Sequence, residues 1–263
     1  MITVVSPHLD DAVFGCGALL AAHPGAVVVT ALAGGPPPSR DRVTSWDVAC
    51  GFAAGDDVIA GRRAEDRESL ALLGATPVWL DFWDAQYGRA TSPSELGESL
   101  ARTLPPGPGP VFLPLGLFHS DHLLTAAASL PLVRAFPGRR FFAYEEAFYR
   151  RIAGLREQAL ARLAAHDIAA EPADPADLDS SPRSLPRGLP LTSADCLERK
   201  RRAVHCYHSQ LRGLTTPGRP GLEDAFAPER FWRLRPTHTP RAISGRARAG
   251  PEPDRPEPGS FNQ

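Results

Sequence analysis

The chain has 263 residues, enough for one substantial α/β domain, or two small ones, with a hydrophobic core. Its 29 basic and 30 acidic side chains leave a formal net charge of -1, which excludes the broad positive field that sequence-independent nucleic-acid binding needs. Apolar residues make up 43% of the chain, as in ordinary globular proteins, and no apolar run has the length of a membrane span.

Short apolar runs alternate with helical patterns over the first 145 residues. The apolar runs predict buried strands at residues 2–5, 26–33, 77–80, 111–114 and 140–144. The segments between them predict helices at residues 14–22, 62–73, 94–103 and 121–133, and a proline-rich loop at 34–45. This alternation predicts a Rossmann-like, three-layer α/β fold with a mostly parallel sheet and helices on both faces.

The pattern changes after residue 145. Residues 152–166 and 194–211 predict helices, whereas 168–191, with five prolines, is expected to be an irregular excursion. From residue 241 onward the chain has little to bury, so a disordered tail is expected at 241–263. We therefore interpret residues 1–240 as a single domain.

The cysteines indicate neither a disulfide scaffold nor a thiolate metal site. Cys16, Cys50, Cys196 and Cys206 are scattered and form no Cys-x-x-Cys pair, so we expect small buried hydrophobic side chains. The first residues carry no basic segment of the kind that opens a signal peptide. A cytoplasmic location is the resulting expectation.

A polar motif, Ser-Pro-His-Leu-Asp-Asp at residues 6–11, follows the first predicted strand. In open α/β sheets, ligands bind at the carboxyl ends of the strands. His8 and Asp11 are three residues apart, and at such a turn they can supply two of the three protein ligands of a catalytic zinc site. Asp10 lies between them and is expected to be free to act as a base.

A second group of this kind, His119-Ser120-Asp121-His122, follows the fourth predicted strand. His122 is far from Asp11 in the chain, which is typical of a third ligand that the fold brings in. Two imidazoles and a carboxylate suit Zn²⁺, and Fe²⁺ also fits such a set. Either motif alone is more often a satisfied polar pair, but their joint placement after two strands of one sheet predicts a metal site.

Other motifs give weaker signals. Residues 15–17, Gly-Cys-Gly, resemble the start of a dinucleotide-binding loop, but Leu20 stands where the third glycine of that motif should be. Close helix–sheet packing is therefore the preferred interpretation of these glycines. His205 and His208 have no nearby carboxylate, so packing or substrate contact is preferred over a second metal. Ser6 lacks the glycine elbow of a hydrolase nucleophile.

Two patterns accompany the metal motifs and lead to a family resemblance. An Arg-x-x-Glu helix ends in Leu-Gly, and a late helix carries a Lys…Tyr-x-Ser-Gln pattern, at Arg62, Glu65, Leu73, Gly74, Lys200, Tyr207, Ser209 and Gln210. With Pro-His-Leu-Asp-Asp-Ala at residues 7–12 and His-Ser-Asp-His at 119–122, the sequence resembles the zinc-dependent N-acetylglucosaminyl deacetylases. This family includes the phosphatidylinositol-glycan, mycothiol and bacillithiol pathway deacetylases and antibiotic-sugar deacetylases. The resemblance covers roughly residues 2–235.

The resemblance implies roles for the residues of both motifs. It implies that the zinc ligands are His8, Asp11 and His122. It further implies that Asp10 is the general base and that His119 stabilises the oxyanion and helps the amine to leave. Asp121 then orients a histidine, as carboxylates beside metal ligands commonly do.

Arg62 and Asp84 resemble positions that hold sugar hydroxyls. An Arg62–Glu65 helix pair and a strand-end cap at Asp84 explain these residues equally well. Leu9 and Ala12 replace a proline and a glutamate of the family motif, as in the branch that trims acyl groups from glycosylated natural products. The implied activity is zinc-dependent removal of an N-acetyl or N-acyl group from an aminosugar of a glycoconjugate or specialised metabolite.

Two alternatives stay open. One is an amidase of thiol-sugar conjugates, which would use the same metal set. The other is a non-catalytic sugar- or nucleotide-binding module on the same fold, although such a module would need neither Asp10 nor His119. The residues around the entrance of the substrate site are expected at 36–38, 82–83 and 168–191. A large, apolar entrance would suit a bulky glycosylated acceptor, whereas a small, polar one would suit a free disaccharide.

Overall fold

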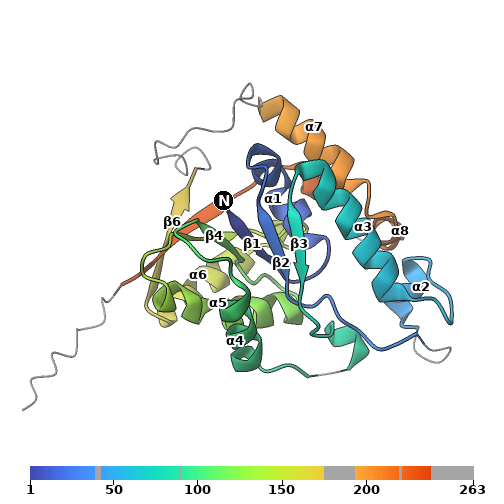
Figure 1. Ribbon diagram of the computed structural model, residues 1–263, viewed down its shortest axis with the longest axis horizontal. Coiled ribbons are helices and arrows are strands. Elements are labelled where there is room, and N and C mark those ends of the chain that lie inside the picture. The colour runs from blue at the N-terminus through green and yellow to red at the C-terminus, as the bar shows by residue number, and fades with distance from the viewer. Residues whose placement is uncertain (39–42, 89, 175–192, 219–220, 238–263) are drawn as a thin grey trace, which may run out of the picture.

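A computed structural model describes residues 1–38, 43–88, 90–174, 193–218 and 221–237 of the chain. The strands are β1 (Thr3–Ser6), β2 (Val27–Thr30), β3 (Thr76–Trp79), β4 (Val111–Pro114), β5 (Phe141–Tyr144), β6 (Ile168–Ala173) and β7 (Phe231–Pro236). They form one seven-stranded sheet in the order β3-β2-β1-β4-β5-β7-β6 (Figure 1). Neighbours among the first five are parallel, whereas β7 is antiparallel to both β5 and β6. The predicted fold class is confirmed.

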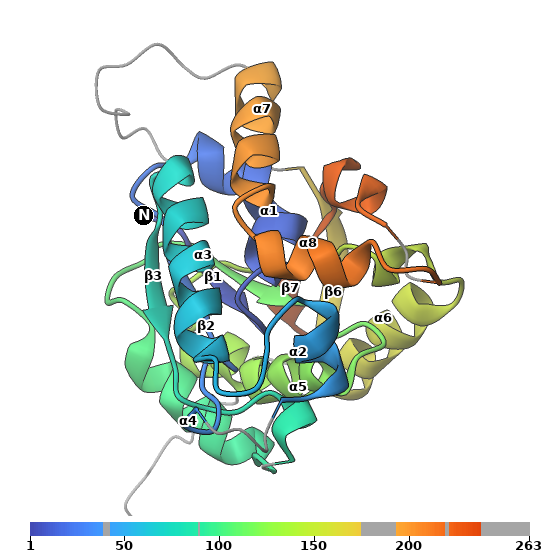
Figure 2. The same ribbon diagram turned by 90° about the vertical axis from the view of Figure 1, so that its right-hand side faces the viewer.

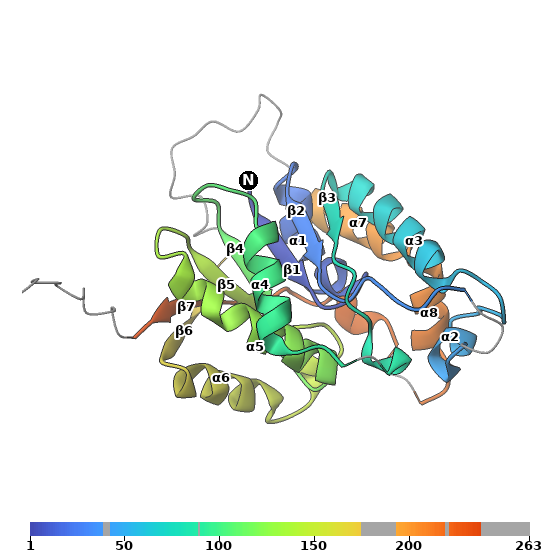
Figure 3. The same ribbon diagram turned by 60° about the horizontal axis from the view of Figure 1, so that its bottom comes forward.

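Helices cover both faces of the sheet (Figure 3). One layer consists of α1 (Asp11–Ala22), α3 (Val58–Leu73) and α7 (Ser193–Val204), which pack on one another. The other consists of α4 (Pro93–Thr103), α5 (Ser120–Ala135) and α6 (Leu155–Ala165). Two short helices, α2 (Ser45–Ala49) and α8 (His208–Leu214), lie side by side (Figure 2). Single 3-10 turns are η1 (Ala85–Tyr87), η2 (Tyr149–Arg151) and η4 (Glu223–Phe226).

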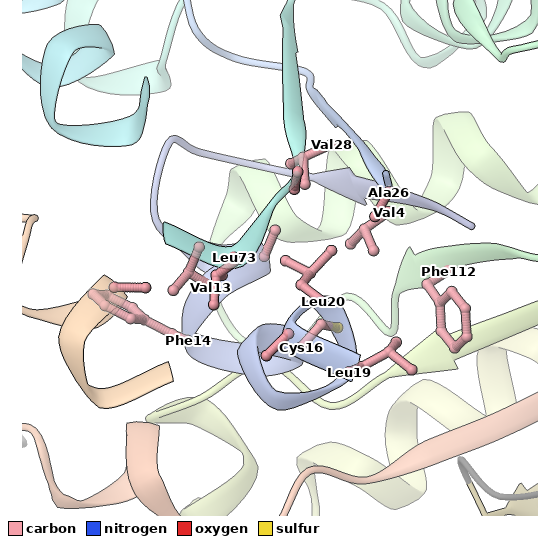
Figure 4. Packing of buried hydrophobic residues seen from close by; sticks show 14 of the residues in the cluster. Val4, Val13, Phe14, Cys16, Leu19, Leu20, Ala26, Val28, Leu73 and Phe112 are labelled. Carbon is pink, nitrogen blue, oxygen red and sulfur yellow. The ribbon is translucent and has the colours of Figure 1, made fainter. Parts of the chain in front are cut away.

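The alternation of side chains along the central strands divides the core into two halves. Val4 of β1 and Val28 of β2 face α1, where they meet Leu19 and Leu20 (Figure 4). Val5 and its neighbours in the sheet face α4 and α5 instead. A strand that is buried on both faces needs apolar residues at consecutive positions, which is why these strands read as unbroken valine runs.

The predicted elements of the first half match the structure closely, and the late helix does not. The expected helix at 14–22 begins earlier, at Asp11, because the turn after β1 leads directly into it. The expected helix at 194–211 is instead two helices, α7 and α8, with a break before His208. At that break the Tyr207 hydroxyl is buried and donates a hydrogen bond of 2.8 Å to Asp66, a partner that local sequence does not reveal.

The expected irregular excursion at 168–191 is wrong at its start. Ile168–Ala173 forms β6, the edge strand of the sheet, paired along its whole length with β7. Pro172 is tolerated there because an edge strand has one side on which no ladder hydrogen bond is needed. Residues 175–192 and the expected tail at 241–263 lie outside the described part of the chain.

The strand order places a ligand-binding edge between β1 and β4. The chain proceeds outward from β1 in one direction through β2 and β3, then returns to the other side of β1 with β4. Loops that leave the carboxyl ends of two such strands diverge and leave a crevice between them. All four cysteines are free and buried, as expected. None of the helices in the described residues has the length and apolar character that crossing a membrane requires.

Candidate metal and active site

The two polar motifs meet at this crevice. The first follows β1, where the Ser6 hydroxyl accepts a hydrogen bond of 2.9 Å from the Ala12 backbone N–H and thereby caps the start of α1. Asp10 occupies the N-cap position of that helix but makes no side-chain capping bond. Ser6 therefore satisfies the Ala12 backbone N–H at the start of α1, and neither Asp10 nor Asp11 is needed for that cap.

His8, Asp11 and His122 converge on one point. The Oδ2 atom of Asp11 lies 3.1 Å from His8 Nδ1 and 3.2 Å from His122 Nε2. Around a tetrahedral ion with bonds of about 2.0–2.1 Å, neighbouring donor atoms are about 3.3 Å apart. The three donor atoms all lie within 4.8 Å of one another. Two imidazole nitrogens and one carboxylate oxygen thus fit a divalent ion of the zinc or iron type.

Carboxylates stand behind both histidines. His8 Nε2 lies 3.0 Å from Asp121 Oδ2, and His122 Nδ1 lies 3.3 Å from Glu146 Oε1. Each ring therefore has its outer nitrogen beside an acid, which fixes the ring orientation and leaves the inner nitrogen facing Asp11. Asp121 thus sits where the sequence placed a histidine-orienting group, whereas Glu146 was not predicted.

Glu146 is fully buried and also holds the loop that leads to the second motif. Its Oε1 atom accepts hydrogen bonds of 2.8 and 3.0 Å from the backbone N–H groups of Gly116 and Leu117. Its position in the sequence could have identified it as a site residue, because the acidic pair Glu145-Glu146 directly follows β5 at the same edge of the sheet. A polar group after each of three neighbouring strands is the pattern of a site at that edge.

Charges around this centre favour a cation. Burial alone would lower the pKa of His122, yet the Asp11 carboxylate beside it raises that pKa to about 9. Burial likewise acts to raise the pKa of Asp121, but hydrogen bonds from His8 and from the Ala85 backbone lower it to about 2. The raised pKa of His122 reflects the carboxylate charge of Asp11 and Glu146 beside it, which a bound cation would neutralise.

Asp10 and His119 line a cavity of about 310 Å³ beside the three converging residues. Burial and the adjacent Asp11 carboxylate raise the pKa of Asp10 to about 7, so a proton is held and released near neutral pH. His119 is the N-cap of α5, and its Nδ1 atom accepts a hydrogen bond of 3.3 Å from the Asp121 backbone N–H. Its side chain is 37% exposed. Burial and the neighbouring histidine rings lower its pKa, which favours the neutral imidazole.

Arg62 and Asp84 also line the cavity. The Arg62 guanidinium donates a hydrogen bond of 2.8 Å to Asp47, a fully buried residue of α2 that the sequence did not suggest. The alternative Arg62–Glu65 pair does not form, since Glu65 accepts hydrogen bonds from the backbone and hydroxyl of Ser209. Asp84 caps the 3-10 turn η1 and not the end of a strand, and its Oδ2 atom also lies 4.0 Å from His8 Nε2.

The cavity wall is apolar away from the polar centre. Neither residues 36–38 nor 82–83, expected at the rim, are among the lining residues. The apolar side chains that line the cavity are Leu9, Leu32, Trp46, Ile59, Phe148, Tyr149 and Leu214. They come from six separate segments of the chain, which explains why local sequence did not identify them.

Comparison with known proteins agrees with this arrangement. Residues 3–133 match the model of the PIG-L family, described as GlcNAc-PI de-N-acetylase, and this span contains both polar motifs. No curated protein matches the chain. Among solved structures, the chain is similar to the A40926 pseudoaglycone deacetylase, with 24% identity, a TM-score of 0.61 and coverage of 90% of this chain and 98% of that one.

Two structures from teicoplanin biosynthesis extend the likeness. A triple mutant of the deacetylase has 23% identity and a TM-score of 0.66, and the zinc-inhibited form of teicoplanin deacetylase has 22% identity and a TM-score of 0.59. Each pairing covers 89% of this chain and 97% of the other. The shared fold therefore extends well past residue 133, where the family match ends.

Proposed function

Because the chain belongs to the PIG-L family of GlcNAc-PI de-N-acetylases, we propose that it is a metal-dependent hydrolase that removes the N-acetyl or N-acyl group of an aminosugar. The observation that carries this proposal is the convergence of His8, Asp11 and His122 beside a cavity that Asp10 and His119 line. The deacetylase names of the similar solved structures support the same reaction class.

His8, Asp11 and His122 would hold the metal, for which Zn²⁺ is the first candidate and Fe²⁺ the second. A divalent ion at this point supplies Lewis acidity, which acidifies a water molecule and polarises an amide carbonyl. Asp121 and Glu146 keep the two imidazoles oriented through their outer nitrogens. The chemistry of the donor set, neutral nitrogen and carboxylate oxygen, is what such an ion requires.

Asp10 is the proposed general base. Its carboxylate is neither a cap of α1 nor one of the three converging donors, and its pKa, raised by burial and by Asp11 to about 7, suits proton transfer at neutral pH. It takes a proton from the attacking water. Once protonated, it can return that proton to the nitrogen of the leaving amine, so one residue serves both halves of the hydrolysis.

His119 is the proposed oxyanion donor. Because Nδ1 accepts the Asp121 backbone N–H, the neutral ring carries its own proton on Nε2. That N–H can stabilise the negative oxygen that develops when water adds to the amide. The lowered pKa of His119, caused by burial and the neighbouring histidines, favours this neutral donor over the imidazolium. Protonation of the amine is therefore better assigned to Asp10.

Arg62 and Asp84 are the proposed sugar-binding residues. They face the same cavity as Asp10, and Arg62 is held rigid by Asp47 and by the Tyr87 hydroxyl. A guanidinium fixed in this way can donate to sugar hydroxyls without losing side-chain freedom on binding. Such donors would orient the sugar so that its amide reaches Asp10.

The direct test is amine release from a panel of N-acetylglucosamine derivatives, assayed as prepared, after chelation, and after Zn²⁺ is restored. The panel runs from free sugars through pseudodisaccharides to a glycosylated aglycone. Release that stops on chelation and returns with Zn²⁺ is expected. Failure to bind Zn²⁺ at all would exclude the metal centre, and bound Zn²⁺ without release from any member would exclude this amide as substrate.

A further inference from the structure

Phe118 is an exposed aromatic residue at a strained backbone position. Its side chain is 60% exposed, and its φ angle of 56° lies in the left-handed region that a bulky residue rarely adopts. It directly precedes His119, the proposed oxyanion donor. Strain at such a position is maintained only where the surroundings enforce it, and it is concentrated at functional sites.

The Phe118 ring continues the wall of the cavity outward. It stacks on Tyr149, with ring centroids 5.4 Å apart and an interplanar angle of 27°. Tyr149 lines the cavity and meets the His122 ring edge to face at 5.1 Å. An aromatic surface therefore runs from beside the proposed metal ligands to the outside of the protein.

Two anchored loops hold these rings in place. The Phe118 loop is fixed at Gly116 and Leu117 by the buried Glu146 carboxylate. The Tyr149 loop begins at that same glutamate, and its Phe148 also has a positive φ, of 71°. The Phe148 backbone N–H donates a hydrogen bond of 2.6 Å to Asp224. The rings are thus presented by a rigid frame, which reduces the entropy lost when a ligand stacks on them.

We propose that Phe118 and Tyr149 form an acceptor subsite, which stacks against an aromatic group attached to the aminosugar. This inference rests on the proposed function, because it places the sugar amide at Asp10 and the attached group at the cavity mouth. Offset stacking between aromatic rings contributes about 0.5–1.5 kcal/mol, which corresponds to about 2- to 12-fold in affinity. The subsite therefore favours a glycoside with an aromatic aglycone over a free sugar.

The test compares the binding of para-nitrophenyl and methyl N-acetylglucosaminides by isothermal titration calorimetry, in both anomeric forms. The metal-loaded protein is expected to bind the better aryl anomer about 3- to 10-fold more tightly than its methyl counterpart. This ratio should fall to about one in Phe118→Ala and Phe118→Gly, because both lose the ring. Glycine also removes the backbone strain, so agreement between the two variants assigns the effect to the ring.

Ile152→Ala is the matched control, since Ile152 is also an exposed apolar residue but does not line the cavity. It should keep the aryl preference of the unmodified protein. An equal affinity for aryl and methyl ligands, or a preference that survives Phe118→Gly, would overturn the acceptor subsite and leave the proposed hydrolase intact. If neither the aryl nor the methyl glycoside binds, the acceptor subsite is overturned. A parallel amine-release assay then shows whether the proposed hydrolase activity is also absent.

Discussion

Asp10 and Asp11 are neighbours in the chain with different surroundings. Asp11 contacts two imidazoles, whereas Asp10 lines the cavity with a pKa that burial and Asp11 raise to about 7. Asp10→Asn keeps the shape and the hydrogen-bonding capacity but removes the basic oxygen. We expect this variant to retain its metal, measured by elemental analysis after dialysis, and to lose amine release by at least about 100-fold. Full activity in Asp10→Asn would remove the base assignment.

His122→Ala should give the opposite result. His122 is almost fully buried, and its Nε2 atom is one of three donors that converge within 4.8 Å. Removal of one donor leaves two, too few for a stable site of this type. The variant is expected to lose both metal and activity, whereas Asp10→Asn loses activity alone. A His122→Ala protein that retained one equivalent of metal would show that another residue completes the site.

His119→Ala tests the oxyanion donor. Loss of one such donor typically lowers the rate by about 100- to 1,000-fold, while substrate binding is largely kept. We therefore expect a fall of that size in kcat with a small change in KM and with unchanged metal content. A fall in metal content instead would indicate that His119 is a ligand, as its proximity to His8 and Asp121 also permits.

Asp66 carries a pH effect that is separate from the proposed active site. Burial raises the pKa of its carboxyl from 3.8 to about 6, although Trp79 and Tyr207 donate hydrogen bonds to it. A folded-state pKa above the unfolded value stabilises the fold at low pH, and this contribution is lost as pH rises through about 6. Between pH 4 and pH 7, the free energy of unfolding of Asp66→Asn should increase by up to about 3 kcal/mol relative to that of the unmodified protein, as measured by chemical unfolding. A difference that does not change with pH would contradict the shift.

At the scale of elements, the helix that follows the first motif is interrupted. Cys16 has non-helical angles (φ -133°, ψ 15°), so backbone groups on either side of it lose their helical partners. Lys200, the only lysine of the chain, donates a hydrogen bond of 2.8 Å to the Phe14 carbonyl. Glu229 accepts from the backbone N–H groups of Ala18 and Leu19. Distant side chains thus replace the bonds that the kink removes.

Lys200 and Glu229 also pair with each other at 2.8 Å, with the lysine fully buried. Removal of one partner from a buried pair typically costs about 3–5 kcal/mol, because the other charge stays unpaired. Lys200→Met should therefore destabilise the fold by about that amount in chemical unfolding. The double variant Lys200→Met/Glu229→Gln should regain part of the loss. If the double variant were the sum of both single losses, the two side chains would act independently.

The same helix shows what local sequence can and cannot indicate. Gly15 and Gly17 were interpreted as sites of close packing, and a Cβ atom there would lie 2.8 Å from Tyr144 and 2.6 Å from Lys200. Helix–sheet packing is confirmed for Gly15, which lies against β5, whereas Gly17 lies against helix α7 instead. The kink between them was not predicted, because its stabilising partners are 186 and 211 residues away in the chain. Contacts of that separation leave no periodicity in a sequence.

At the scale of the whole molecule, the parallel half was predictable and the antiparallel edge was not. The central parallel strands β1, β4 and β5 are buried on both faces, so their apolar runs are visible by themselves. Phe231–Pro236, in contrast, alternates aromatic, basic and apolar residues, and it is defined by pairing with β5 and β6. The convergence of His8, Asp11 and His122 was predictable because parallel strands end at one edge. Glu146 and Asp47 were missed because only the folded chain shows that they are buried.

The three converging donors lie in the turn after β1 and in the first turns of α1 and α5, so a bound ion would link distant parts of the fold. Such an ion binds the folded chain and not the unfolded one, and at 100 times its Kd it stabilises the fold by about 2.7 kcal/mol. For a domain of this size that corresponds to about 5–10 °C in Tm. Calorimetry should therefore show a Tm that falls on chelation and recovers with Zn²⁺. His122→Ala should be insensitive to both treatments, and an unmodified protein whose Tm ignored chelation would show that no structural link through a metal exists.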